Sequence, residues 1–427
     1  MSSASRIGRA ALLILLAGPR VASAAAVDST AAFELIRANA LPLRLQDDTL
    51  AGPGAARLMA EGSRSRFVLV GEDHGIAELP RFCTAYFHGL QRIGFHHVAI
   101  EVGPVTAQII GDLAREKDPI AAFRRYDAAH PWSMPFVNWR EEAAWVADVI
   151  RTSGGRSDAL WGLDQEFLES PRIHFERLQA LARTPQAKAL AESCLTSARE
   201  LYARSIAEKD LRAGWMLSVD DATFDRLVRA FGPPGSAGGR IVAELRASRG
   251  VYAHLLGGDG YANNLERTLL LKRHLGDYLR AARAAGETRP RVLFKFGAIH
   301  AMRGRTTVDT YDIGSATHEL AEIEGGLAFN VFVQGSSGTQ NGYRPYGGAL
   351  ADTAAKIAPV SSGLWSTGID QVLRDQASNW LLIDLRPLRR ELATQGSSGV
   401  PRAIERLAWS YDALLAIREV HASHLLN

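Results

Sequence analysis

The chain has 427 residues, of which 47% are hydrophobic and 22% charged, so it can bury a sizeable core and is not intrinsically disordered. Its formal net charge is +3, and three arginines without any acid lie within the first 24 residues, so the remainder is neutral. A neutral chain gives no electrostatic reason to expect nucleic acid or an anionic membrane as a partner. Two cysteines are too few for a cysteine-rich metal site.

The first 24 residues have the pattern of a secretory signal peptide. Arg6 and Arg9 precede an apolar stretch at residues 10–17, and the segment Ala22–Ala24 offers small residues for cleavage. That stretch is far shorter than the ~20 residues that span a bilayer, and no later segment is apolar enough to do so. We therefore expect a periplasmic or secreted protein cleaved near Ala24, with an uncleaved N-terminal anchor as the alternative.

Residues 25–170 alternate strand and helix patterns, which is typical of βαβ units around a parallel sheet. The predicted strands are 67–70, 98–100 and 159–163, and the predicted helices are 79–93, 105–115 and 139–151. Cys83 and Cys194 lie in apolar, helix-like surroundings, so we expect two buried thiols, although an exported protein would also permit a disulfide.

The pattern changes at residue 171, because residues 171–285 are almost entirely helical and predict an insertion. Residues 286–427 then form the second part of the core. Their predicted elements are strands at 292–296, 328–334 and 380–385, a surface loop at 335–348 and an amphipathic C-terminal helix at 401–419. The sequence thus predicts an α/β fold with a central, mostly parallel sheet flanked by helices and a largely helical insertion.

Ionisable side chains follow four of the predicted strands. They are Glu72, Asp73 and His74 after the first, Glu101 after the second, Asp164 and Glu166 after the third, and His300 after the strand at 292–296. Neighbouring strands lie about 4.8 Å apart and ligands bind beyond their carboxyl ends, so these side chains can converge. Charges beside apolar layers are costly unless they are paired or bind a metal. Two histidines and several carboxylates fit either a general-base site or a divalent-metal site.

Two further segments are candidates for parts of this site. Glu78 lies four residues past His74, in the first turn of a helix, where it either complements the helix dipole or orients His74. Arg140, next to Trp139, either lines a pocket or belongs to a packed surface loop. Nucleophile-elbow, P-loop, dinucleotide-binding and HExxH motifs do not occur in the sequence.

Several segments together resemble the erythromycin-esterase-like superfamily, which also includes the Tiki/TraB and ChaN-like proteins. The segments are Gly71–Glu78, the strand that ends in Glu101, the run Gly162–Asp164 and the motif Gly297–His300. The segment Tyr261–Asn264 keeps an Asn of the esterase branch but not the Arg near it. Asp73 directly precedes His74, where that branch has one more residue, so the resemblance does not extend to a macrolide substrate.

The resemblance implies different chemistry in its branches. In the esterase branch, a histidine assisted by glutamate activates water without a required metal. In the Tiki branch, two histidines and a glutamate support a divalent metal and peptide hydrolysis. The ChaN-like branch is linked to haem-iron uptake. In that reading, His74 or His300 of this chain would be an axial ligand.

The sequence therefore predicts a hydrolase of an ester, lactone or amide, acting on a small molecule or a peptide. Its predicted catalytic residues are His74, Glu72, Glu101, His300 and Glu78, and its predicted substrate-binding residues are Asp164, Glu166, Asn264 and Arg140. The predicted cofactor is none or a divalent Zn or Mn, with His74, His300, Glu72 and Glu101 as candidate ligands. The alternatives are a metal-dependent peptidase and a haem- or iron-binding protein.

Overall fold

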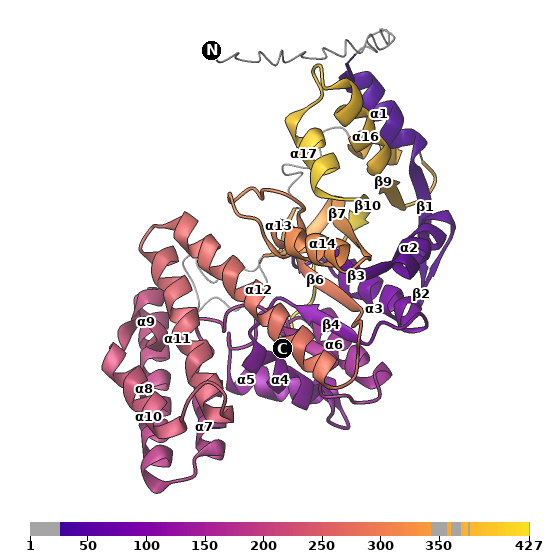
Figure 1. Cartoon of the computed structure of the whole chain (residues 1–427). Coiled ribbons are helices and arrows are strands. Elements are labelled where there is room, and N and C mark those ends of the chain that lie inside the picture. Colours follow the sequence, from indigo (N-terminus) through magenta and orange to yellow (C-terminus); the bar gives the residue numbers. More distant parts are fainter. Residues whose placement is uncertain (1–25, 343–356, 360–368, 375, 427) are drawn as a thin grey trace, which may run out of the picture.

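The protein is described here by a computed structural model that covers residues 26–342, 357–359, 369–374 and 376–426. The predicted signal peptide lies outside these residues. Within them, one sheet of ten strands has the order β2-β1-β9-β10-β7-β3-β6-β4-β5, and β8 pairs with β7 (Figure 1). The strands are β1 (Ala40–Gln46), β2 (Thr49–Ala51), β3 (Ser65–Glu72), β4 (His97–Ile100), β5 (Leu160–Gly162), β6 (Val292–Gly297), β7 (Leu327–Asn341), β8 (Ile357–Pro359), β9 (Trp380–Asp384) and β10 (Ala413–Val420).

The predicted parallel sheet is confirmed. Strands β10, β7, β3, β6, β4 and β5 run parallel, whereas β9, β1 and β2 extend the sheet by antiparallel pairing. The central strand β3 is buried on both faces, because Val68 and Val70 enter one core cluster while Phe67 and Leu69 enter the other. This explains why the central strands read as continuous apolar runs.

Helices cover both faces of the sheet. One face packs against α2 (Pro53–Arg64), α3 (Glu78–Gln91), α4 (Pro104–Ala114), α5 (Pro119–Ala129) and α6 (Arg140–Thr152). The other packs against α1 (Ser29–Ala38), α12 (Gly260–Ala284), α13 (Ala298–Ala301), α14 (Ile313–Ile323), α15 (Ile369–Arg374), α16 (Arg386–Gln395) and α17 (Arg402–Ser410).

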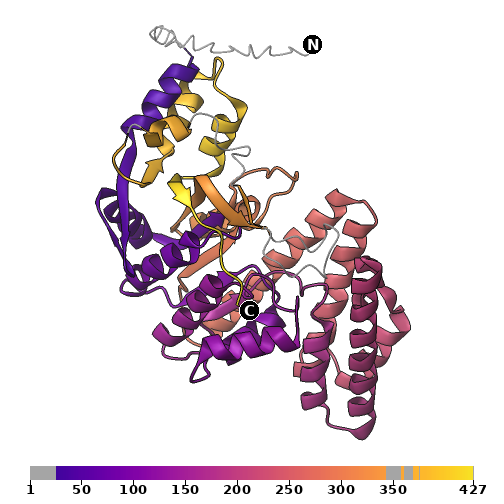
Figure 2. The same cartoon turned by 180° about the vertical axis from the view of Figure 1, so that it is seen from behind.

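The predicted insertion is a helical bundle with a core of its own. It contains α7 (Pro171–Leu181), α8 (Pro185–Glu208), a short 3₁₀ helix (Leu211–Ala213), α9 (Trp215–Ser218), α10 (Asp221–Phe231) and α11 (Ala237–Leu256). Figures 1 and 2 show this bundle to one side of the sheet, with the long helix α12 running from it onto the sheet.

The C-terminal part differs from the prediction. The predicted helix 401–419 ends at Ser410, and residues 413–420 form β10 instead. These residues favour a helix locally, but β7 and β9 flank them on both sides, and that pairing decides their conformation. Part of the predicted loop 335–348 is also wrong, because β7 continues to Asn341; residues 343–348 lie outside the described part.

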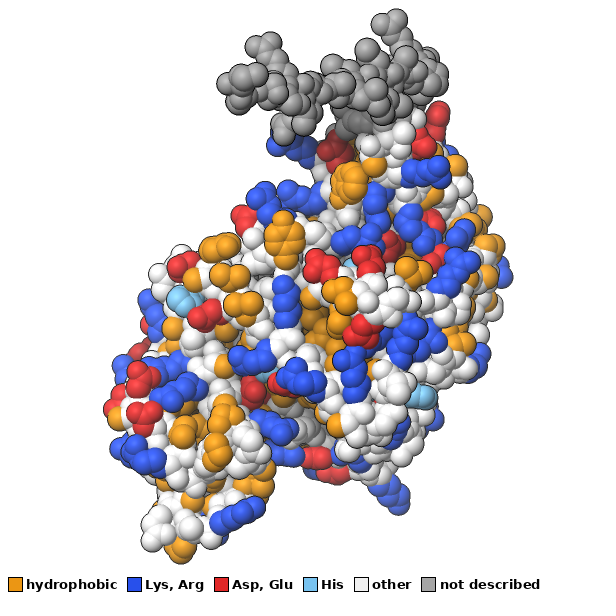
Figure 3. Space-filling view, in the orientation of Figure 1, with side chains coloured by type: hydrophobic (Ala, Val, Ile, Leu, Met, Phe, Trp, Pro, Cys, Tyr) orange, Lys and Arg blue, Asp and Glu red, His pale blue; other side chains and the backbone are white. Residues whose placement is uncertain are grey.

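Cys83 and Cys194 are free and buried, which confirms the prediction of two buried thiols. Burial raises the pKa of both thiols, that of Cys194 to about 11. Within the described residues, no helix combines the length and the apolar character needed to cross a bilayer. Basic and acidic side chains are intermixed on the face seen in Figure 3.

Candidate active site

The structure brings two imidazoles and two glutamates together at one edge of the sheet. Strands β3, β6 and β4 are parallel neighbours, and Glu72 is in register with Gly297. Their carboxyl ends therefore lie side by side. His74 follows β3 by two residues, Glu101 follows β4 directly, and His300 lies in the short helix α13 after β6.

Glu101 is the centre of this cluster. Its Oε2 accepts a hydrogen bond from the Gly297 N–H at 2.6 Å and lies 3.6 Å from Nε2 of His74. Its Oε1 accepts from the Arg267 guanidinium at 2.7 Å and lies 3.4 Å from Nε2 of His300. Burial alone would raise the pKa of Glu101, but the two imidazoles and Arg267 hold it well below its usual range.

His74 faces a glutamate with each ring nitrogen and is still partly exposed. Its Nδ1 lies 2.7 Å from Oε1 of Glu72, and its ring stacks on Phe136 with centroids 4.3 Å apart. Donation of the Nδ1 proton to Glu72 leaves a lone pair on Nε2. A Cβ on Gly297 would lie only 2.9 Å from that Nε2 and 3.2 Å from Oε2 of Glu101, so glycine permits the close approach of both side chains to the end of β6. Phe136 has a φ of 66°, a strained conformation for a residue with a side chain.

The pKa of His74 is set by opposing effects. Burial alone would lower it, but the nearby carboxylates of Glu101 and Glu72 raise it above its usual value. The side chain is still 26% exposed, so solvent reaches it. His74 is therefore a stronger base than a free imidazole, placed where a ligand can meet it.

His300 is a cation at neutral pH. Its Nδ1 lies 2.8 Å from Oδ2 of Asp312, whose other carboxylate oxygen accepts from the backbone N–H of Ile313 at the start of α14. Burial and Arg267 lower the pKa of His300, but Asp312 and Glu101 outweigh them and raise it to about 10. As an imidazolium, His300 donates hydrogen bonds from both ring nitrogens.

A buried lysine lies behind Glu72. Lys295, in the middle of β6, places its Nζ 2.7 Å from Oε2 of Glu72 and 2.7 Å from Oε1 of Glu142 in α6, and 5.3 Å from the centroid of the Trp145 ring. Burial alone would raise the pKa of Glu72, but Lys295 and His74 lower it. Burial raises the pKa of Glu142 to about 7. Lys295 thus keeps Glu72 ionised as the partner of His74.

Solved structures match this arrangement of helices and strands over most of the chain. A point mutant of the erythromycin esterase EreC in its open conformation has a TM-score of 0.62 and 14% identity, and covers 91% of this chain and 99% of its own. A succinoglycan biosynthesis protein has a TM-score of 0.59, 14% identity and coverages of 93% and 98%. A Bacillus cereus protein has a TM-score of 0.55, 15% identity and coverages of 93% and 99%. No protein-family model and no curated protein sequence matches the chain.

The chain has an erythromycin-esterase-like fold. At this level of identity the likeness shows the fold alone, so the roles of individual side chains rest on the geometry of this site. One element of that geometry corrects the sequence analysis, which found no Arg near Asn264. Arg267, one turn further along α12, donates to Asp164 through Nε at 2.9 Å and also reaches Glu101.

Four of the predicted site residues lie elsewhere in this erythromycin-esterase-like fold. Glu78 accepts from the backbone and ring of His421 and thereby fixes the C-terminal segment. Glu166 is fully buried between the start of α4 and His174, where every one of its contacts is structural. Asn264 donates to the Gly260 carbonyl within α12 and Arg140 is exposed, so among the contacts of the described residues neither reaches the cluster.

The structure also adds residues that the sequence analysis missed. They are Arg267, Lys295, Glu142, Asp312 and Phe136. Lys295 carries a recognisable signal, because a lysine inside an otherwise apolar central strand must be buried and paired. The other four lie on helices or loops far from the strand ends in sequence. Of these, Arg267 alone has a nearby signal, since it follows Asn264 by three residues.

Three of the four predicted metal ligands contact other charged side chains. Glu72 is paired with Lys295, Glu101 is paired with Arg267, and Nδ1 of His300 lies 2.8 Å from Asp312. Among the described residues, the one group of three His, Cys, Asp or Glu side chains with donor atoms within 4.8 Å of one another is at the opposite end of β4. It consists of His97, Asp158 and Glu287, and Arg156 pairs with both acids.

We predict that Lys295→Met destabilises the protein by about 3 kcal/mol or more, because it leaves Glu72 and Glu142 buried without a cation. Urea denaturation monitored by circular dichroism measures this loss. Adding Glu142→Gln to the Lys295→Met variant should restore part of the lost stability. The control Arg204→Met breaks the exposed pair with Glu208 and should change stability little. Equal effects of Lys295→Met and Arg204→Met would contradict the described network.

The raised pKa of His300 makes stability depend on pH. Because the folded-state pKa of about 10 exceeds the unfolded value near 6.5, the contribution of His300 is complete below pH 6.5 and declines as pH rises toward 10. His300→Gln should reduce the slope of unfolding free energy between pH 7 and 9 by about 1.4 kcal/mol per pH unit. His254→Gln, at a half-exposed histidine, should keep the slope. An unchanged slope in His300→Gln would show that His300 is neutral.

Proposed function

We propose that this protein is a hydrolase of an ester, lactone or amide bond in which His74 activates water. The observation that carries the proposal is the arrangement of His74, whose Nδ1 lies 2.7 Å from Oε1 of Glu72 while its side chain remains 26% exposed to solvent. The erythromycin-esterase-like fold supports a hydrolase without naming its substrate.

The proposed reaction gives His74, Glu72 and His300 separate roles. Nε2 of His74 takes a proton from water while the water oxygen bonds to the carbonyl carbon of the substrate. As this bond forms, the π electrons of the carbonyl C=O bond move to the carbonyl oxygen. Glu72 accepts the Nδ1 hydrogen bond and stabilises the imidazolium that forms. The His300 imidazolium donates a hydrogen bond to the developing oxyanion. When the intermediate collapses, the bond to the leaving group breaks and His74 returns the proton to it.

Glu101 and Arg267 are positioning residues in this scheme. Glu101 contacts the N–H of Gly297 and faces both imidazoles, so it fixes the separation between the proposed base and the proposed oxyanion donor. Arg267 balances the charge of Glu101 and is itself held by Asp164. The site therefore reaches its catalytic arrangement before the substrate binds.

We predict that His74→Gln lowers kcat/KM by at least about a hundredfold toward any ester, lactone or amide found by screening the wild-type protein. Glutamine keeps a hydrogen bond to Glu72 but cannot accept a proton from water. Steady-state kinetics on the hit substrate measures the loss, and a thermal melt checks that the fold is kept.

Two companion variants sharpen this test. Gly297→Ala places a methyl group against Nε2 of His74 and should also abolish turnover. The control His421→Gln changes an exposed histidine that also contacts a glutamate, and it should leave turnover intact. Full activity of folded His74→Gln would refute the proposed base.

The proposed reaction needs no metal, since Lys295 and Arg267 already neutralise the carboxylates. Protein purified without chelator should contain less than stoichiometric Zn or Mn by elemental analysis. Its turnover should survive dialysis against a chelator. Loss of activity on chelation, restored by added metal, would favour the peptidase-like alternative.

The proposed exported location rests on the pattern of the first 24 residues alone. Sequencing the N-terminus of protein recovered from cells tests it, because cleavage near Ala24 is expected.

A further inference from the structure

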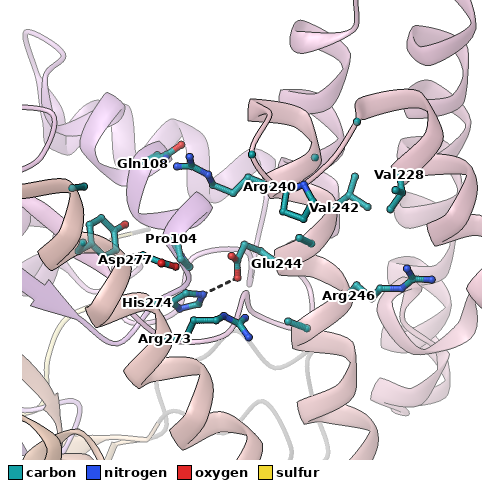
Figure 4. A pocket seen from close by; sticks show the side chains of 18 residues that line it. Pro104, Gln108, Val228, Arg240, Val242, Glu244, Arg246, Arg273, His274 and Asp277 are labelled. Atoms are coloured by element: carbon teal, nitrogen blue, oxygen red, sulfur yellow. Dashed lines mark hydrogen bonds and ion pairs between the residues drawn. The ribbon is translucent and has the colours of Figure 1, made fainter. Parts of the chain in front are cut away.

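A large cavity lies away from the candidate active site. It has a volume of about 1080 Å³ and lies between the start of α4, the α10–α11 connection and the second half of α12 (Figure 4). Along α12, the first residue of its lining is Arg273, six residues beyond Arg267, or roughly 9 Å. A volume of this size is enough for a small organic molecule.

Apolar groups form much of the cavity wall. Val228, Val242 and Ala247 come from the bundle, and Pro104 comes from α4. Tyr278 adds an aromatic ring that is stacked on Trp161, with centroids 5.2 Å apart, so its orientation is fixed. Such a wall favours a ligand with an apolar body.

The two acids that line the cavity each have a cation of their own. Glu244 lies 2.9 Å from Nε2 of the buried His274, and Figure 4 shows this pair in the middle of the cavity. The ring of His274 is also held through Nδ1 by the Leu163 carbonyl. The second acid of the lining, Asp277, pairs with Arg280 on the same helix. Neither carboxylate is therefore left to balance a further cation.

Three arginines line the same cavity, and two of them, both exposed, form no ion pair within the described part of the chain. Arg246 pairs with Asp225. Arg240 in α11 and Arg273 in α12 make no ion pair or side-chain hydrogen bond with any described residue. In the view of Figure 4, they lie on either side of the Glu244–His274 pair. The cavity thus combines an apolar wall with two uncompensated positive charges from different helices.

We propose that this cavity binds an amphipathic organic anion, whose apolar body packs against the wall and whose carboxylate, sulfonate or phosphate group is attracted by Arg240 and Arg273. Guanidinium groups form strong charge-assisted hydrogen bonds with such groups. This second site is separate from the cluster around His74 and does not depend on the proposed hydrolase activity. The two sites are linked through neighbouring residues, because the carbonyl of Leu163 contacts the ring of His274 and the next residue, Asp164, accepts from Arg267.

The test uses the full chain and two fluorescent probes with the same apolar skeleton, anilinonaphthalene sulfonate and uncharged N-phenylnaphthylamine. The sulfonate should bind the wild-type protein saturably, and Arg240→Gln combined with Arg273→Gln should weaken it at least about tenfold. The same double variant should leave the affinity for the uncharged probe unchanged. Arg64→Gln, at an exposed arginine of α2 outside the cavity, controls for the loss of a positive charge.

A steric variant makes the test independent of charge. Ala281→Trp, at an exposed position of the cavity lining, should weaken the binding of both probes without changing the melting temperature. The proposal is overturned if the sulfonate shows no saturable binding. It is also overturned if the double variant binds the sulfonate as tightly as the wild-type protein, or if Ala281→Trp affects neither probe.

Discussion

The buried carboxylate of Glu101 is the interaction on which the rest of the site depends. An isolated carboxylate in an apolar environment is strongly unfavourable, so its charge must be met by nearby donors and cations. Here the donors come from three parts of the chain: the backbone of Gly297, the guanidinium of Arg267 and the ring of His300. Removing any one of them leaves charge uncompensated. The need to satisfy one acid thus fixes the end of β6, the position of α12 and, through α12, the attachment of the helical bundle to the sheet.

A second buried network consists of Lys295, Glu72 and Glu142, and it contacts the cluster around Glu101 through His74. Lys295 holds Glu72 from inside the sheet, and Glu72 in turn holds Nδ1 of His74. Buried ion pairs seldom add net stability compared with apolar side chains of similar volume, so their value here lies in placing charge. Glu142, whose pKa is raised to about 7, gives this network a proton that it can gain or lose near neutrality. The two networks meet only at His74, which faces Glu72 with one nitrogen and Glu101 with the other.

Much of this site could be predicted from a simple rule about parallel sheets. The residues that the rule missed or misplaced have physical explanations. The strand-end rule found Glu72, His74, Glu101 and His300, because the residues just past the ends of parallel strands all lie at one edge of the sheet. It could not find Arg267, since a helix residue more than a hundred positions away reaches the site only through tertiary packing. It also placed Glu166 in the site, although that acid lies four residues beyond its strand and turns back to the start of α4. Strand β10 was missed for a related reason: its alanines and leucines favour a helix, and only its neighbours β7 and β9 impose an extended chain.

The balance of charge explains why His74, rather than another member of the cluster, is suited to take a proton. Two buried carboxylates face this ring, Glu101 at Nε2 and Glu72 at Nδ1. They raise the pKa of His74 in spite of its burial. In the proposed reaction, a proton drawn from water onto His74 is stabilised by both carboxylates, and the negative charge that appears on a substrate oxygen can meet the positive charge of His300.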